Sequence, residues 1–225
     1  MLGTSVIVPA QISFGAIGAP VAEADEKPEA SFDLAPVTVQ IRKAAVWATV
    51  TDETLEDYSG FSAWMNSEFK RQLLTAIDNQ LLNGTGVAPA VAGLLATTGV
   101  QTQSKGADTL TVAISKAFAK VLAAGFFPTA ILVSPTDFAA LTAATPLEFN
   151  GTFFGVPLIA SESVADGAPI VGDFSCGTVF EKGGIYFEMT NANDQNFIHN
   201  ETTVRAESRL ALGVFSPPAF CAVVA

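Results

Sequence analysis

Few residues of this chain have the chemistry of an enzyme active site. His199 is the only histidine among 225 residues, which nearly excludes a Ser-His-Asp triad or a histidine-rich metal site. The two cysteines, Cys176 and Cys221, lie far apart in apolar, small-residue surroundings, and we expect reduced, buried thiols. The sequence therefore predicts no cofactor and no metal, and it gives no positive signal for an enzyme.

Acidic side chains are the remaining candidates for chemistry, and four of them cluster in the stretch "TDETLEDY". Such a cluster could bind a cation or serve a soluble acidic hydrolase. Acids that follow a threonine are also typical of the first turn of a helix, where they interact favourably with the helix dipole. We expect the four acids, which are Asp52, Glu53, Glu56 and Asp57, to take this second role or to line a solvated face.

The composition is more apolar than an isolated monomer needs. Hydrophobic residues make up 49% of the chain and charged residues 15%, with a mean hydropathy of +0.40, whereas soluble domains average about 25% charged residues. The longest apolar run, residues 121–133, contains Gly125 and Pro128 and is shorter than the roughly 20 residues of a membrane span. We therefore expect no membrane partner but extensive contacts between subunits, with Trp47 and Trp64 as core or interface anchors.

The charge is strongly acidic and partly concentrated in one stretch. The net charge is −11, which makes sequence-specific recognition of DNA or RNA unexpected, since such a chain repels nucleic acid. The stretch "VAEADEKPEAS", residues 21–31, holds four acids and one base, Lys27. Nothing in this stretch could build a core, so its role must lie at the surface.

Strands are predicted on both sides of this acidic stretch. Residues 4–19 indicate an irregular strand, and over 37–42 apolar and polar residues alternate with the period of a half-buried strand. The alternation slips at Ala44–Ala45, where we expect a bend or bulge. Together the two strands predict an extended hairpin with Lys27 near its tip.

The rest of the chain mixes helices and strands, as in an α+β fold. Apolar residues recur every four positions in a long predicted helix over about 60–84, and further helices are predicted over 108–124 and 135–144. The remaining predicted elements are strands at 129–135, 153–161 and 168–175, a hairpin over 177–189 that turns at Gly183–Gly184, and an extended tail over 199–225.

These segments, in this order, resemble the major capsid proteins of tailed phages of the Hong-Kong-97 type. "VAEADEKPEAS" is similar to the extended loop of that family, and "LLNGTG" with the following "GLL" resembles the end of its spine helix. "SPTDFAAL", "FGVPLI" and "VGDFS" resemble segments of its apical domain, and "NFIHN" and "RAESRLALGVFSPPAFCAV" resemble its closing strands. The similarity runs from about Gly18 to the last residue.

The resemblance implies an α+β, HK97-like capsid fold: a peripheral domain with a long spine helix and long β-strands, an apical α/β domain and an extended β-hairpin loop. It places a residual N-terminal segment and the first loop strand in 1–19, and the extended loop with its return strand in 20–45. The peripheral domain would take 46–107, the apical domain 108–184, and the closing peripheral strands 185–225.

The function implied by the resemblance is structural. Copies of the chain would form pentamers and hexamers of an icosahedral shell that encloses phage double-stranded DNA, in a virion assembled in the host cytoplasm. Further implied partners are scaffolding, protease, portal and decoration proteins, with non-specific contact to the packaged DNA. An encapsulin-type bacterial nanocompartment shell is the alternative with the same fold, and the acidic hydrolase is the remote one.

Some members of this family join neighbouring subunits through isopeptide bonds. A lysine on the extended loop attacks an asparagine carboxamide of a neighbour, ammonia leaves, and a glutamate assists. The matching positions are Lys27, Asn200 and Glu207. The resemblance thus implies an autocatalytic cross-link between these residues from different subunits.

The same three residues also have ordinary interpretations. An attacking amine must be neutral, whereas a free lysine is almost fully charged at pH 7 because its pKa is about 10.4. On one extended strand Asn200 and Glu207 would be about 23 Å apart, at about 3.3 Å per residue, so one lysine could meet both only in different subunits. Alternatively, Lys27 pairs with the acids beside it, Asn200 is a turn residue, and Glu207 pairs with Arg205 or Arg209. Both interpretations stay open from the sequence.

Overall fold

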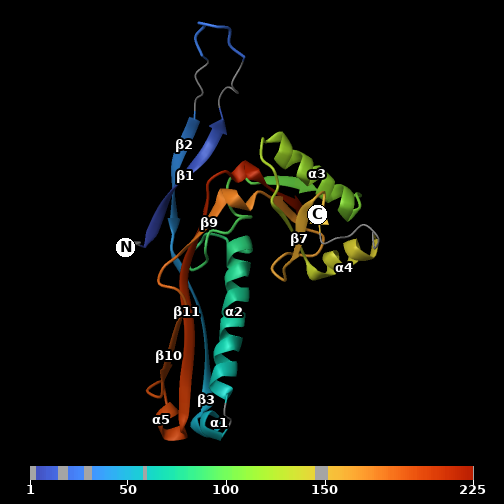
Figure 1. Ribbon diagram of the computed structural model, residues 1–225. Helices are drawn as coiled ribbons and strands as arrows, with labels where there is room; N and C mark the ends of the chain where they lie inside the picture. Colours follow the sequence, from blue (N-terminus) through green and yellow to red (C-terminus); the bar gives the residue numbers. More distant parts are fainter. Residues whose placement is uncertain (1–3, 15–19, 28–31, 58–59, 145–151, 225) are drawn as a thin grey trace.

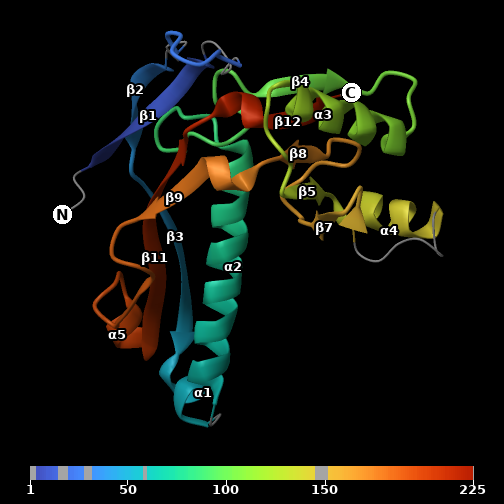
Figure 2. The same cartoon turned by 45° about the horizontal axis from the view of Figure 1, so that its top comes forward.

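A computed structural model describes residues 4–14, 20–27, 32–57, 60–144 and 152–224 of the chain. These residues form three parts (Figures 1 and 2). A two-stranded hairpin extends away from the body; a four-stranded sheet, here called the long sheet, runs beside one long helix; and a six-stranded sheet, the compact sheet, packs with two further helices. The element types confirm the mixed α+β character predicted from the sequence.

The hairpin consists of β1 (Ser5–Phe14) and β2 (Phe32–Gln40), which pair antiparallel. Successive side chains of a strand alternate between its two faces. One face carries Val8 and Val39, which are buried in a cluster with Ala211 of the long sheet. The base of the hairpin is therefore fixed on the body by its inner face, and the outer face is turned away.

Two prolines lie opposite each other in this hairpin, Pro9 of β1 and Pro36 of β2. Neither has an amide hydrogen, so at this level neither strand can donate a backbone hydrogen bond to an added strand. Natural sheets use proline at edges to prevent such pairing. The two prolines therefore disfavour the pairing of a further strand with either edge of the hairpin at this level.

The central strand of the long sheet is β11, which pairs with β3 along one edge and with β10 and then β9 along the other. The hairpin predicted over 177–189 is therefore wrong. Its two strands do not pair with each other but follow one another along the same edge of β11, because the chain turns at Gly183–Gly184 without folding back. The strands are β3 (Arg42–Thr51), β9 (Gly177–Glu181), β10 (Tyr186–Thr190) and β11 (Glu201–Val214), and the short α5 (Asn196–His199) precedes β11.

The bulge expected at Ala44–Ala45 is also absent from β3. Ala44 pairs with Ser208 and Ala45 with Glu207 in continuous register, and burial alternates along the whole strand. The chain breaks instead at Ile41, between β2 and β3. The alternation therefore changes parity at Ile41, between the two strands, and the two small alanines made the change look as if it came later.

The long helix α2 (Phe61–Asn83) lies along one face of the long sheet (Figure 1). Its bounds agree with the periodicity to within one residue at each end. It follows α1 (Asp52–Asp57), which begins directly after Thr51 as predicted. None of the described helices has both the length and the apolar character needed to cross a bilayer. The buried core between helix and sheet is formed by Met65, Phe69, Leu73, Ile77, Val91, Val204, Ala206 and Leu210.

The end of α2 is closed by the loop that follows it. Leu94 N–H donates to the carbonyl of Leu81 (2.8 Å) and Leu95 N–H to that of Leu82 (3.0 Å), so the loop satisfies carbonyls that a helix end leaves without partners. The loop can approach this closely only because residue 93 is glycine: a Cβ at Gly93 would lie 2.6 Å from the backbone nitrogen of Gly84.

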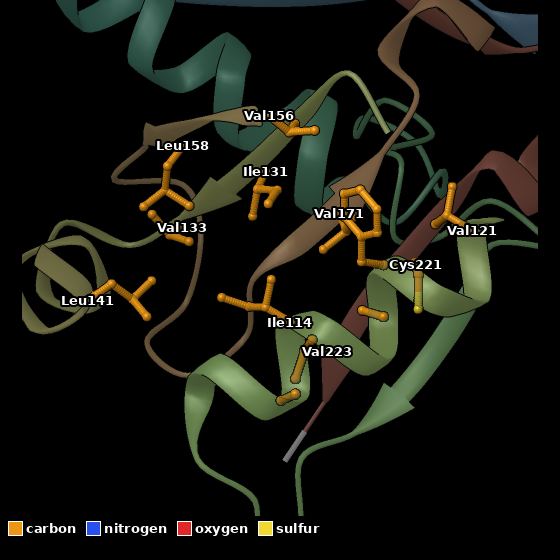
Figure 3. Close-up of a cluster of buried hydrophobic side chains, with 13 residues drawn as sticks. Ile114, Val121, Ile131, Val133, Leu141, Val156, Leu158, Val171, Cys221 and Val223 are labelled. Atoms are coloured by element: carbon orange, nitrogen blue, oxygen red, sulfur yellow. The ribbon is translucent and has the colours of Figure 1, made fainter. Parts of the chain in front are cut away.

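The compact sheet has the strand order β4-β12-β8-β5-β7-β6. Side chains of α3 (Leu110–Ala123) and α4 (Pro135–Ala144) share one buried core with it, as Figure 3 shows for Ile114, Ile131 and Leu141. Both helices were predicted. The strands are β4 (Gln101–Ser104), β5 (Ala130–Val133), β6 (Thr152–Phe153), β7 (Val156–Ala160), β8 (Ile170–Gly172) and β12 (Phe220–Val224), and the short turns η1 (Phe174–Cys176) and η2 (Pro217–Ala219) lie between strands.

Sheet membership differs from the expected unit boundaries. β12, expected among the closing peripheral strands, is a neighbour of β4 in the compact sheet, and no strand was predicted at the residues of β4. β9, expected in the apical domain, pairs with β11 of the long sheet. The reason for β12 is its apolar character: Phe220, Cys221 and Val223 are at most 1% exposed. Such a continuous apolar run is typical of a strand covered on both faces.

Candidate functional site

The structure separates the three residues that match the family cross-link. Lys27 is exposed in the loop 20–27, beyond the far end of the hairpin. Asn200 directly follows α5, which lies at the opposite end of the molecule (Figure 1). Glu207 lies seven residues further on, within β11. Lys27 and Asn200 of one subunit are therefore not brought together.

Lys27 has no hydrogen bond or ion pair with any part of the chain that the structure describes. The neighbouring acids Asp25 and Glu26 are exposed and do not pair with it, whereas Glu29 lies outside the described residues. The ordinary interpretation of Lys27 is thus confirmed for its solvated position in a loop, its pairing with Asp25 or Glu26 is not found, and a pairing with Glu29 stays a prediction. Its amine is directed to solvent.

Asn200 is the residue that turns the chain from α5 into β11. Its backbone is left-handed, with φ 53° and ψ 52°, a conformation that asparagine adopts more readily than most residues. Its main-chain carbonyl accepts a hydrogen bond from Asp52 N–H at 2.8 Å. The interpretation of Asn200 as a turn residue is confirmed, and its carboxamide is exposed.

Glu207 is the one candidate held in a defined polar network. Its Oε2 atom accepts from Lys43 Nζ at 3.2 Å, and Arg205 Nε lies 3.7 Å away. Arg205 also pairs with Glu188 on β10. The side chain of Glu207 is only 14% exposed. The expected pairing with Arg205 is confirmed, but the shorter contact is made by Lys43.

The position of Lys43 explains why the sequence did not reveal this contact. Glu207 lies opposite Ala45 in the β3–β11 ladder, so Lys43, two residues before Ala45, is its diagonal neighbour on the same face. The hydrogen bond from Lys43, together with its charge and those of Arg205 and Arg209, lowers the pKa of Glu207 despite partial desolvation, which acts in the opposite direction. Glu207 is thus held as a carboxylate.

Replacing Lys43 by methionine should raise the pKa of Glu207 toward its ordinary value of 4.5, because the strongest contribution is lost while the aliphatic stem is kept. A lowered pKa stabilises the folded state above the unfolded pKa, and this stabilisation disappears as the pH falls through the folded pKa. The stability difference between wild type and Lys43→Met should be below about 1 kcal/mol at pH 7, since Lys43 is half exposed, and should shrink in acid. A carboxyl NMR titration of Glu207 measures the shift; an unchanged pKa would contradict the assignment.

The outer face of the hairpin is a second candidate, for binding rather than chemistry. Ile7 is 68% exposed and Leu34 56% exposed, and Pro9 and Pro36, on the same face, are exposed as well. All four side chains are apolar. Contiguous exposed apolar side chains on a protruding element are typical of a protein–protein contact.

Of the four acids, Asp52 and Glu53 lie in the first turn of α1, whereas Glu56 and Asp57 lie exposed at its end. Asp52 accepts a hydrogen bond from the Thr202 hydroxyl at 2.6 Å, and Thr51 Oγ1 accepts from Thr54 N–H at 3.4 Å, as at a capped helix. Within the described ranges, no three His, Cys, Asp or Glu side chains are grouped so that they could hold a metal ion. His199 is exposed and within hydrogen-bond distance of Gln195 Oε1, at 3.3 Å.

Two other expectations are met only in part. Cys176 and Cys221 are both free, but only Cys221 is buried and Cys176 is half-buried; burial raises the pKa of both thiols. Trp47 and Trp64 are 64% and 59% exposed, so neither is a core residue. Trp47 lies on the solvent-facing side of β3, opposite Arg205.

Comparison with known proteins identifies the architecture. The fold is shared with a chain from Mycobacterium phage Ogopogo at a TM-score of 0.70 and 20% identity, covering 97% of this chain and 86% of that one. It is also shared with the capsid of a native GTA particle at a TM-score of 0.73 and 15% identity, covering 99% and 85%. A mixed α+β body with a long helix and a protruding hairpin is thus the HK97-like capsid fold.

The sequence agrees with the fold. The model of the phage capsid family matches residues 3–225, and the chain belongs to that family. It is 25% identical over 213 residues to the major capsid protein of Enterobacteria phage HK97. The match covers 88% of this chain, and the chain spans 55% of the length of that curated relative.

Proposed function

We propose that this chain is a structural shell protein whose copies assemble, as pentamers and hexamers, into an icosahedral phage shell around double-stranded DNA. The observation that carries this proposal is the hairpin. It projects from the body (Figure 1) and presents an exposed apolar face that its own subunit leaves uncovered. A ring of identical subunits would cover such a face head to tail.

The wider setting follows from the same proposal. The shell would be part of the virion and would assemble in the host cytoplasm, with scaffolding, protease, portal and decoration proteins as further partners. A net charge of −11 would limit adhesion of packaged DNA to the shell wall, since like charges repel. Contact with the DNA would therefore be weak and independent of its sequence.

Electron microscopy of the purified protein tests the proposal. Closed particles are expected, and particles that contain nucleic acid after nuclease treatment of the outside would distinguish a phage shell from an encapsulin-type compartment, which would hold protein cargo. Elution as a monomer on size exclusion, with no particles under any assembly condition, would contradict the shell function.

A second proposal concerns the covalent bond. The amine of Lys27 would attack the Asn200 carboxamide of another subunit; the new C–N bond forms, the amide C–N bond breaks, and ammonia leaves. The amine attacks in its neutral form, and Glu207 of a third subunit would take a proton from the attacking nitrogen and pass it to the departing NH2 group, which leaves as ammonia. Support comes from the exposure of Lys27 and Asn200 and from the ionised state of Glu207. The hydrogen bond from Lys43 to Glu207 would have to break so that the incoming amine could reach the carboxylate.

Boiling assembled shells in detergent and running a denaturing gel tests the bond. Cross-linked wild type should give a ladder or material retained in the well, and Lys27→Ala should abolish it while leaving the particles intact. Asn200→Asp should do the same, because a carboxylate is not attacked by an amine; Asn193→Asp is the matched control and should keep the ladder. A single band near 23.3 kDa from wild-type shells would remove the cross-link but not the shell function.

A further inference from the structure

A hollow of about 330 Å³ lies at the base of the hairpin, between the inner face of β1 and β2 and the loop 86–98 that follows α2. The residues that line this hollow are mainly apolar, with a few uncharged polar ones. Arg42, the first residue of β3, is the single charged residue that lines it within the described part of the chain. A chain with a net charge of −11 thus places one isolated positive charge in this hollow.

Among the residues that the structure describes, none is a partner for the guanidinium of Arg42. Its Nε atom is buried and has no hydrogen bond, and its side chain makes no ion pair with any residue that the structure describes. A buried donor without an acceptor costs roughly 1–3 kcal/mol, and more when the group is charged. We therefore expect an acceptor from outside the subunit, and a carboxylate matches the planar fork of arginine best.

The subunit's own acidic loop is out of reach of Arg42. The hairpin pairs from Ser5–Gln40 at its base to Phe14–Phe32 at its far end, a distance of about 30 Å at roughly 3.3 Å per residue. Arg42 lies two residues beyond the base, whereas the loop 20–27 lies beyond the far end (Figure 1). A carboxylate from this loop can arrive only from another copy.

The loop 20–27 has the properties of the missing partner. Every one of its residues is exposed, and its carboxylates, on Glu23, Asp25 and Glu26, form no hydrogen bond or ion pair with the described chain. The loop is narrow and protrudes, as an element that enters a hollow must. The acids of α1 fit less well, because Asp52 is already bonded to Thr202.

We propose that Arg42 of one subunit binds a carboxylate of the loop 20–27 of a second subunit, which enters the hollow at the hairpin base. The contact rests on the proposed shell function and adds to it a specific electrostatic anchor. It joins identical subunits head to tail, since the loop and the hollow are different surfaces of the chain.

A charge swap tests this contact in the full chain. Two variants are compared with wild type: Arg42→Glu, and a loop variant that combines Glu23→Lys, Asp25→Lys and Glu26→Lys. Each variant should raise the subunit concentration at half-assembly at least tenfold. The combined variant should return it to within threefold of wild type, because the salt bridge is restored in reverse. Lys70→Glu, an equal charge change at an exposed position of α2, is the matched control and should not be rescued by the loop substitutions.

Each other outcome has a defined meaning. Normal assembly of the loop variant, or no rescue in the combined variant, overturns the contact. The thermal midpoint of dissociated subunits shows whether Arg42→Glu folds. If it does not fold, the assembly of the loop variant by itself tests the contact. Normal assembly of Arg42→Glu with loss of retained nucleic acid would assign Arg42 to a phosphate and overturn the contact as well. Failure of wild type to assemble would refute the shell function itself and this contact with it.

Discussion

Replacing Gly93 by alanine should lower the free energy of unfolding by about 3 kcal/mol, the upper part of the usual range for overpacking. The added Cβ would lie 2.6 Å from Gly84 N and 2.9 Å from the carbonyl oxygens of Gln80 and Leu82. All three are backbone atoms at the end of α2, so no side chain can move aside. The loop would have to withdraw and leave the last helix carbonyls unpaired. Urea denaturation of dissociated subunits measures the loss.

Gly177→Ala is the matched control for this substitution. A Cβ at Gly177 would meet nothing closer than 3.8 Å, and its backbone is extended, with φ −130°, so alanine fits without strain. We expect a change within about 0.5 kcal/mol. Equal effects of the two substitutions would show that the tight closure of α2 contributes nothing specific to stability.

Changing Ile7 and Leu34 together to threonine should leave the subunit folded and weaken assembly by about 30-fold. Both side chains are more than half exposed in the subunit, so folding loses little, and threonine keeps the preference for β-structure. If a neighbour covers them, their burial contributes about 2 kcal/mol per subunit, and each 1.4 kcal/mol is a factor of ten. The subunit concentration at half-assembly, followed by light scattering, gives the number.

Thr38→Ser serves as the control on the same face of the hairpin, since Thr38 lies opposite Ile7 and the change removes only a methyl group. The shift in half-assembly concentration that Thr38→Ser causes should be about ten times smaller than the shift caused by the double variant. Unaltered assembly of the Ile7→Thr/Leu34→Thr variant would mean that this face remains in solvent in the shell. The observation behind the proposed function would then be lost.

The elements that sequence reasoning predicted are those with a local signal. The four-residue recurrence of apolar side chains located α2, and the polar stretch between two strands located the hairpin. The errors concern pairing between distant segments. Nothing near 177–189 indicates that β9 and β10 both pair with β11, and nothing local places β12 beside β4.

The same distinction applies to the candidate site. Lys27, Asn200 and Glu207 were found by their positions relative to recognisable segments. The contact between Glu207 and Lys43 depends on the register of β3 with β11, and the unpaired state of Arg42 depends on the hollow around it. Both are properties of three-dimensional packing that residue types and spacing do not carry.

The opposed prolines of the hairpin bear on how growth of an assembly is stopped. A bare strand edge recruits another strand, which exposes a fresh edge in turn, and the product is an open fibre with no final size. Pro9 and Pro36 each remove one backbone donor from the two strands of the hairpin, at the same level. In the proposed shell, subunits would therefore associate through side chains rather than through added strands, in a geometry that ends in a closed surface instead of an open fibre.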